Sequence, residues 1–245
     1  MKLFPKSPKS GYQVDAGFSD NSGMHYLDVI DRLETELSVD LYLEIGSRSG
    51  ASIARRTCSF IAIDPEFAVT APVFNSAELM LFFQQTSDAF FASGVLEALD
   101  QKPDLAFIDG MHLFEYALRD FIHCERSMGE NGVVCFHDVA PFNHAMTTRD
   151  ITYLNGSGMP WTGDVWKVMV ALKEYRPDLT VELLSAQKTG LGVVSGLAPD
   201  NTVLADKLDT IVAKYTDITL KEFGVTAYFD QFPIKHPEEL SLFKP

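Results

Sequence analysis

The chain has little of what several classes of protein require. It contains three cysteines, Cys58, Cys124 and Cys135, and none of them forms a CxxC spacing, so neither a disulfide framework nor a zinc knuckle is predicted. No run approaches about 18 apolar residues, and the N-terminal MKLFPKSPKSG has no apolar core. We therefore expect a cytoplasmic protein in a reducing compartment, with neither a membrane span nor a secretory signal.

Basic residues are also scarce. The sequence has 20 Lys and Arg against 34 Asp and Glu, which gives a formal net charge of −14 and a pI of about 4.7. Because like charges repel at long range, a chain this acidic is poorly suited to bind a phosphate backbone. We expect no nucleic-acid partner.

Apolar residues are abundant enough for one sizeable core. They make up 46% of the 245 residues, and we expect a single domain over 1–245. Residues 1–20 are expected to form an irregular arm, 21–195 a Rossmann-like core, and 196–245 a helical extension and tail. The tail could pack on the body or on a second subunit of a homo-oligomer.

The segment 41–64 organises the rest of the chain. An apolar run at 41–45 ends in a turn bracketed by Gly46 and Gly50, and a second apolar run at 60–63 ends on Asp64. Glycines in such a turn let the backbone approach a ligand closely, and an acid about 20 residues further on can accept hydrogen bonds from ribose hydroxyls. The pattern predicts half of a nucleotide-binding βαβ unit.

Alternating apolar patterns predict the remaining elements. We expect helices over 24–37 (capped by Asn21 or Ser22), 51–56, 90–99, 113–128, from a cap at Asp164 to Tyr175, and 203–215. We expect strands over 41–45, 60–63, 77–84, 104–109 and 132–138, a hairpin over 179–184 and 191–194, and an irregular tail from 223 onward. Together they predict an α/β fold: a Rossmann-like, doubly wound, mostly parallel seven-stranded sheet with a C-terminal antiparallel hairpin and extra terminal helices.

Five sequence blocks identify a family resemblance. The turn has the form ExGxxxG through Glu44, Gly46 and Gly50, with Arg48 where nicotinamide enzymes carry a glycine. It is followed in order by IAIDPEF, IDGMHLFEYALRD, NGVVCFHD and GDVWKVM. Over 24–175 this set resembles the class I S-adenosylmethionine-dependent methyltransferases, within them the bacterial family that includes sugar O-methyltransferases. The resemblance implies an O-methyltransferase that acts on a small molecule or a glycan.

The resemblance also implies which residues bind S-adenosylmethionine. The turn from Gly46 to Gly50 would receive the methionine moiety, Asp64 the ribose diol, and Ser87 and Asp88 would lie beside adenine. The full set of implied cofactor-binding residues is Glu44, Gly46, Ser47, Gly50, Ser52, Asp64, Ser87 and Asp88. A structural alternative stays open at two places, since Asp64 could cap the turn before Pro65, and Ser87 or Asp88 could cap a helix.

Two acids end strands that should be neighbours in this fold. Asp109 and Asp138 could then lie about 5 Å apart, the spacing of paired strands. A divalent cation would balance them, as magnesium does at these strand ends in related macrolide-sugar and catechol-type enzymes, and the implied metal ligands are Asp109, His137 and Asp138. Because His137 is a poorer magnesium ligand than a carboxylate, manganese or iron becomes conceivable. A metal-free variant, in which Asp138 orients His112 or His137, stays open.

His112 follows Asp109 by three residues and resembles the general base of the macrolide-sugar enzymes. The implied catalytic residues are His112, Asp109 and Asp138. An unperturbed histidine titrates near pH ~6.5, which suits removal of a proton from an acceptor hydroxyl before its oxygen attacks the sulfonium methyl. The alternatives are a helix-terminal His112 bonded to backbone and a His137 that is partly buried and satisfied.

Two other classes of function remain open. One is a non-catalytic S-adenosylmethionine-binding module that keeps the fold without turnover. The other is a hydroxylase-type enzyme, since cephalosporin hydroxylase proteins are similar over the same blocks. The acceptor depends on loops, which carry no motif that would identify it.

Overall fold

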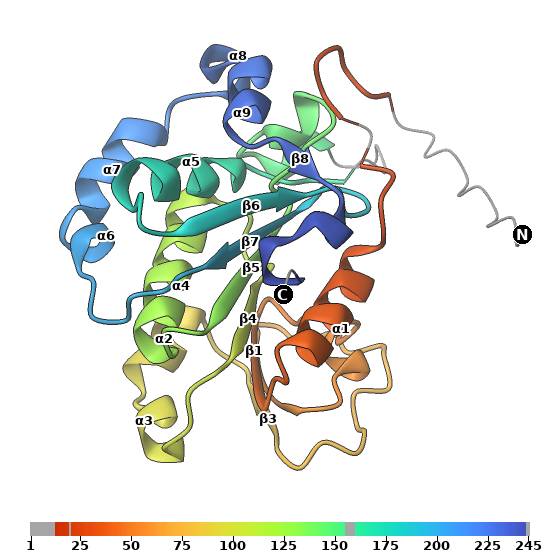
Figure 1. The fold of residues 1–245 in the computed structure, drawn as a ribbon, viewed down its shortest axis with the longest axis vertical. Helices are drawn as coiled ribbons and strands as arrows, with labels where there is room; N and C mark the ends of the chain where they lie inside the picture. Colours follow the sequence, from red (N-terminus) through yellow and green to blue (C-terminus); the bar gives the residue numbers. More distant parts are fainter. Residues whose placement is uncertain (1–12, 20, 155–159, 244–245) are drawn as a thin grey trace, which may run out of the picture.

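The computed structural model describes residues 13–19, 21–154 and 160–243, and its centre is one eight-stranded sheet (Figure 1). The strand order is β3-β2-β1-β4-β5-β7-β6-β8. The strands are β1 (Leu41–Ile45), β2 (Ser59–Ile63), β3 (Met80–Phe83), β4 (Leu105–Ile108), β5 (Val133–His137), β6 (Thr180–Leu184), β7 (Leu191–Ser195) and β8 (Ile234–Lys235). Strands β1 to β5 pair in parallel, whereas β7 runs antiparallel to both β5 and β6. The predicted α/β fold and its antiparallel hairpin are confirmed.

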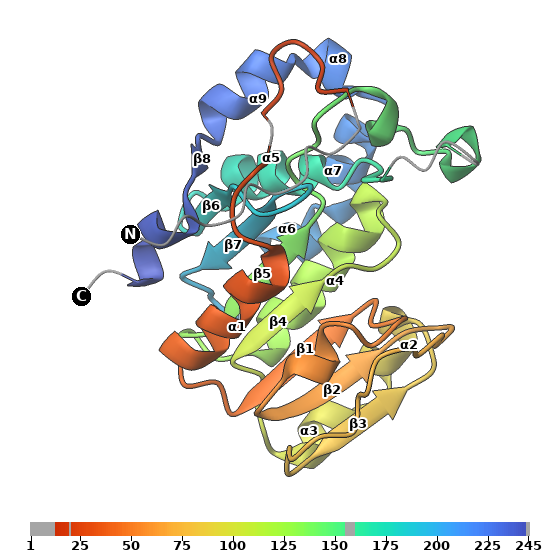
Figure 2. The same ribbon diagram turned by 90° about the vertical axis from the view of Figure 1, so that its right-hand side faces the viewer.

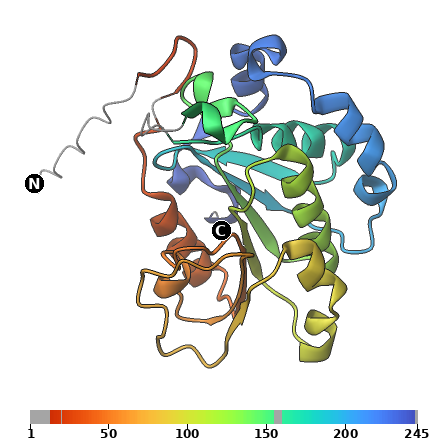
Figure 3. The same cartoon turned by 180° about the vertical axis from the view of Figure 1, so that it is seen from behind.

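Helices cover both faces of the sheet (Figures 2 and 3). One face carries α1 (Tyr26–Glu36), and the opposite face carries α4 (Phe114–Ser127) and α5 (Trp166–Tyr175). Because strand side chains alternate between faces, β1 contributes Leu41 and Leu43 to the core under α4 and Tyr42 to the core under α1. Two apolar layers therefore hold the sheet from either side.

The strand order reverses at β1, which pairs with β2 on one side and β4 on the other. In doubly wound sheets, such a switch point opens a crevice at the carboxyl ends of the strands. Gly46 lies there at φ +94°, and a Cβ at this position would lie 2.1 Å from the Asp109 carbonyl oxygen. Glycine is therefore required for the turn after β1 to pass against the end of β4.

Several predicted elements differ in length. The helix predicted over 90–99 is two helices, α2 (Ser87–Ala92) and α3 (Val95–Leu99), separated at a left-handed Gly94. The helix predicted over 203–215 divides at Lys207 into α6 (Val203–Asp206) and α7 (Leu208–Tyr215), and the helix expected at 51–56 is only a 3-10 turn, η1 (Ile53–Arg55). The periodicity of apolar residues predicts α2 with α3, and α6 with α7, as single helices because the two helices of each pair bury residues on the same side.

Two predictions about the chain ends are wrong. The N-cap of α1 is His25, whose ring accepts from the Leu27 amide at 3.3 Å, instead of Asn21 or Ser22. The tail predicted to be irregular from 223 onward follows α8 (Leu220–Phe223) and forms α9 (Val225–Gln231) and the eighth strand β8, which adds to β6. Aromatic residues of this tail pack on α5, so tertiary contacts order a segment that lacks a clear period.

The described part of the N-terminal arm, 13–19, packs on the loop that follows β5. The Asp15 amide donates to the Phe142 carbonyl at 3.0 Å, and the Asp15 carboxylate accepts from the His144 amide at 3.0 Å. Phe18 meets His144 edge to face. Residues 1–12 of the predicted arm lie outside the described residues.

The three cysteines are free, as expected from their spacing. Within the described ranges, no helix is both long and apolar enough to cross a membrane.

Candidate active site

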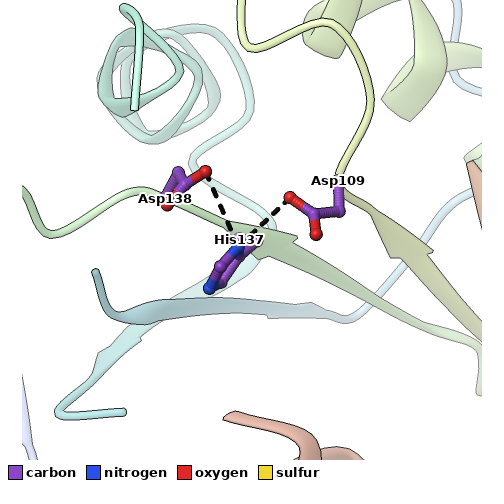
Figure 4. A group of neighbouring side chains, drawn as sticks. All are labelled: Asp109, His137 and Asp138. Carbon is purple, nitrogen blue, oxygen red and sulfur yellow. Dashed lines mark hydrogen bonds and ion pairs between the residues drawn. The ribbon is translucent and has the colours of Figure 1, made fainter. Parts of the chain in front are cut away.

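Three of the predicted site residues meet where β4 and β5 end (Figure 4). Asp109 follows β4, and His137 closes β5 immediately before Asp138. The His137 Nδ1 atom lies 3.1 Å from Asp109 Oδ1 and 3.6 Å from Asp138 Oδ2. One ligand atom of each residue lies within 4.8 Å of those of the other two. The parallel pairing of β4 with β5 therefore brings the three predicted metal ligands together.

His112 reaches the same cluster from the loop before α4. Its Nε2 atom lies 3.2 Å from Asp109 Oδ1, and its Nδ1 atom lies 3.1 Å from Asp138 Oδ2 and 2.8 Å from the Trp161 carbonyl oxygen. Because α4 begins only at Phe114, His112 is not a helix-terminal residue. Its contact with a backbone carbonyl is accompanied by contacts with two carboxylates. Its position thus brings together all three residues predicted to be catalytic.

Two residues of this cluster have left-handed backbones. The φ angles of His112 and Asp138 are +57° and +62°. A positive φ is uncommon for residues other than glycine and costs on the order of 1–3 kcal/mol, and such strain concentrates at functional sites. The surrounding structure must therefore hold both side chains against this cost.

The cluster carries mutually stabilising charges. Burial alone would lower the pKa of His112, but the charge of Asp138 and the hydrogen bond and charge of Asp109 outweigh it and raise the pKa to about 10. The pKa of His137 is also raised, since both carboxylates outweigh its burial. Burial opposes ionisation of Asp109, yet the neighbouring histidines hold its pKa well below the usual range. With no other cation present, the imidazole of His112 is therefore protonated at neutral pH.

The segment Trp161 to Asp164 encloses His112. The Trp161 ring stacks on the imidazole with centroids 5.3 Å apart, and the Asp164 amide donates to the His112 carbonyl at 3.2 Å. Gly163 passes so close that a Cβ there would lie 1.8 Å from the same carbonyl oxygen. This packing maintains the left-handed conformation of His112.

Asp164 anchors that segment, and its predicted role as the cap of α5 is wrong. Its carboxylate instead accepts from the Phe114 amide at 2.8 Å, which caps α4. The same carboxylate pairs with Arg149 at 2.6 Å and with the buried Lys167 at 2.7 Å, while α5 starts from Val165 without a side-chain cap. Asp164 therefore ties the loop after β5 to the helix that follows His112.

The glycine turn lies beside this cluster and is held by its own residues. The Asp64 carboxylate accepts from the Arg48 amide at 2.9 Å and from the Glu66 amide at 2.7 Å. Asp64 thus caps the turn before Glu66, the alternative weighed from sequence, and also fixes the glycine turn. The Ser47 hydroxyl is buried and has no hydrogen-bond partner among the described residues.

Glu44 and Ser52 contact each other under this turn. The Glu44 carboxylate is 2% exposed and accepts from the Tyr42 hydroxyl at 2.6 Å and from the Ser52 hydroxyl. Burial raises the pKa of Glu44 above its usual range. In this structure both predicted cofactor residues are engaged with protein partners.

Ser87 and Asp88 open α2 at the end of β3, but neither is its cap. Thr86 is the cap, and its hydroxyl accepts from the Ala89 amide at 3.3 Å. The Asp88 carboxylate is half exposed and pairs with Arg119 on α4 at 2.8 Å. The cap alternative is therefore wrong for both residues.

Sequence reasoning missed two residues that hold His137. The Tyr26 ring of α1 lies 4.1 Å from the His137 ring, centroid to centroid, and the Thr189 hydroxyl lies 3.3 Å from His137 Nε2. Burial and the charge of Asp109 raise the pKa of Tyr26, so its hydroxyl stays protonated at neutral pH. Neither residue lies in a recognisable block, since α1 precedes the first strand and Thr189 lies between the hairpin strands, so no sequence signal marked them.

A comparison with known protein families gives a match over the middle of the chain. Residues 43–139 match a family described as a methyltransferase domain. No curated protein matches the chain. The matched segment spans the glycine turn, Asp64, Asp109, His112, His137 and Asp138. Residues 43–139 are thus similar to a methyltransferase domain, in agreement with the resemblance of the sequence blocks.

Solved structures of similar shape include three methyltransferases. The O-methyltransferase TomG from Streptomyces achromogenes, in complex with SAM, is 18% identical with a TM-score of 0.48, over 71% of this chain and 80% of that one. An O-methyltransferase from Bacillus cereus with SAH is 11% identical with a TM-score of 0.47, over 76% and 84%. The SAH-bound methyltransferase PaMTH1 from Podospora anserina is 16% identical with a TM-score of 0.44, over 71% and 78%. At such values no acceptor is transferred to this chain.

Proposed function

We propose that this protein transfers the methyl group of S-adenosylmethionine to a hydroxyl oxygen of a small molecule or sugar. The observation that supports it is the cluster of Asp109, His112, His137 and Asp138, which lies directly beside the glycine turn. Gly46 approaches the Asp109 carbonyl within contact distance, so a cofactor on the turn would have its reactive end near the cluster. Only a proton acceptor and charge stabilisation are then needed for oxygen methylation.

The glycine turn fits such a cofactor. The Ser47 hydroxyl is buried without a partner, and a buried polar group of this kind is normally satisfied. The Asp64 carboxylate uses one acceptor position per oxygen on backbone amides, which leaves further lone pairs for ribose hydroxyls. Glycine backbone at 46 and 50 would face the methionine moiety, with Ser87 toward adenine. Glu44 would act indirectly, since Ser52 and Tyr42 occupy its carboxylate.

The cluster also fits a divalent cation. Asp109, His137 and Asp138 offer two carboxylates and one imidazole, a set that suits manganese or iron at least as well as magnesium. When bound, the cation would lower the pKa of an acceptor hydroxyl and stabilise the developing negative charge. Tyr26 and Thr189 would orient His137 for this role from behind.

The raised pKa of His112 favours the metal-assisted variant over the metal-free one. A histidine with a pKa of about 10 already carries its proton at neutral pH and cannot accept another. A divalent cation held by Asp109, His137 and Asp138 would lower the pKa of His112 and so would allow His112 to act as a base. The acceptor proton would then pass to His112, the acceptor oxygen would form a bond to the methyl carbon, and the carbon to sulfur bond would break, leaving S-adenosylhomocysteine.

The proposal is tested with the purified full chain. Isothermal titration with S-adenosylmethionine should show binding, and absence of binding would exclude the proposal. Labelled methyl transfer would then be screened against sugars, phenols and nucleotide-sugars, after exhaustive chelation and after addition of magnesium, manganese or iron. We expect a product heavier by one methyl group and dependent on metal. Oxygen insertion would instead select the hydroxylase alternative, and binding without turnover the non-catalytic one.

A further inference from the structure

Asp120 is a buried acid that the proposed chemistry does not use. It lies in α4, where its side chain is 4% exposed and its helical neighbours Ala117 and Phe121 are buried in the core. It forms no ion pair within the part of the chain that the structure describes. Burying a carboxyl group without a cation is costly, so an acid at a core-facing position needs a reason. Burial raises the pKa of Asp120 to about 7, which shows the size of that cost.

The Asp120 carboxyl points toward the end of β4. Its Oδ2 atom lies 3.8 Å from the place where a Cβ on Gly110 would be, and its carboxyl hydrogen-bonds the Ser87 side chain. It lines a small cavity together with Asp109, Gly110 and His112. Asp120 therefore lies between the residue predicted to adjoin adenine and the residues predicted to perform the chemistry.

The side-chain hydrogen-bond partner of the Asp120 carboxyl is Ser87. A carboxyl group offers about four acceptor positions, and one serine hydroxyl occupies at most one of them. Among the residues that line the cavity, Ile108, Gly110 and Ala117 have no side-chain donor, whereas the donors of His112 and His137 contact Asp109 and Asp138. A ligand group that fills this place must bring a hydrogen-bond donor, because another acceptor would be repelled, and the exocyclic amino group is the one donor that the adenine ring offers.

We infer that Asp120 selects the base of the cofactor by accepting a hydrogen bond from the exocyclic amino group of adenine. The inference rests on the proposed function, since it assumes that S-adenosylmethionine binds with adenine toward Ser87. It explains why a helix that is otherwise packed on the sheet keeps a carboxyl group at the Gly110 turn. Gly110 has no side chain that would separate the Asp120 carboxyl from the amino group of adenine.

The test compares two ligands and several variants by isothermal titration. The ligands are S-adenosylhomocysteine and its analogue with hydrogen in place of the 6-amino group. Wild-type protein should bind the amino form about tenfold more tightly, the value of one hydrogen bond. Asp120→Leu should bind both ligands equally, whereas Asp120→Asn should keep much of the preference because its amide oxygen still accepts.

Controls separate recognition from structure. Asp100→Asn, an exposed acid on the same side of the sheet, should keep the full preference of wild type. If Asp120→Leu does not fold, Asp120→Ala serves in its place, and the preference of wild type is measured without any variant. Equal binding of both ligands by wild type, or an equal loss of both in Asp120→Leu, would overturn the inference while leaving the proposed function intact. Failure of wild type to bind either ligand would overturn both.

Discussion

The two halves of the candidate site are built in different ways. The glycine-turn half, around Gly46 and Asp64, is local: its hydrogen bonds join residues within about one βαβ unit, and its acids are satisfied by backbone amides or hydroxyls. The other half collects Asp109 and His112 from the loop after β4 and His137 from the end of β5, and the segment from Trp161 to Asp164 packs over it. The first half is held by local hydrogen bonds, whereas the second concentrates charge and left-handed backbone.

The largest effect should come from His112. Asparagine tolerates a left-handed backbone, so His112→Asn removes the imidazole with little added strain. We expect kcat to fall by about 10²–10⁴-fold, the usual contribution of a general base, with an unchanged Kd for S-adenosylhomocysteine. Single-turnover kinetics with calorimetry measures both. As a control, His236→Asn replaces an exposed histidine in the tail and should match wild type. Unchanged turnover in His112→Asn would exclude His112 as the general base.

Gly46 connects the two halves and should produce the next largest effect. Gly46→Ala places a Cβ against the Asp109 carbonyl oxygen at a φ of +94°, so either the turn or the end of β4 must shift. We expect a loss of at least about 2 kcal/mol in the free energy of unfolding. Chemical denaturation measures it. Gly129→Ala, where a Cβ meets nothing within 4 Å, is the matched control and should be nearly neutral.

The charges of the chemical half should appear as a pH dependence of stability. Folded His112 keeps its proton up to a pKa of about 10, whereas an unfolded histidine loses it near pH ~6.5. Between these values the folded state binds more protons, so the stability contributed by His112 is complete below pH ~6.5 and is lost as the pH rises toward about 10.

Urea unfolding in the presence of chelator at several pH values in that window measures this loss. The decline should be steeper in wild type than in His112→Asn. Parallel curves for the two proteins would show that His112 is not held protonated.

The smallest effect separates binding from folding within the glycine-turn half. Ser47→Ala removes a hydroxyl that has no partner, so stability should change by no more than about 0.5 kcal/mol while cofactor affinity falls severalfold. Ser52→Ala should instead lower stability by about 1–3 kcal/mol, because it deprives the buried Glu44 of a donor, and should change cofactor affinity little. Equal changes of stability and affinity in both variants would contradict the assignment of Ser47 to cofactor binding and of Ser52 to folding.

Sequence alone determined the fold class and the local half of the site. Strand runs are continuous and apolar, and the glycines and acids that end them follow directly, so their places at the carboxyl edge could be derived without coordinates. It also predicted that Asp109 and Asp138 lie close together, because neighbouring parallel strands end at the same edge of the sheet, and the structure places them together with His137.

Tertiary structure alone decided the chemical state of that cluster. The pKa of His112, assumed ordinary from sequence, depends on two carboxylates and a carbonyl that only the folded chain places around it. Tyr26, Thr189 and the Asp164 anchor also escaped prediction, because their contacts cross long stretches of sequence and follow no period. Period and motif describe what a residue's neighbours in sequence do, whereas charge and strain depend on neighbours in space.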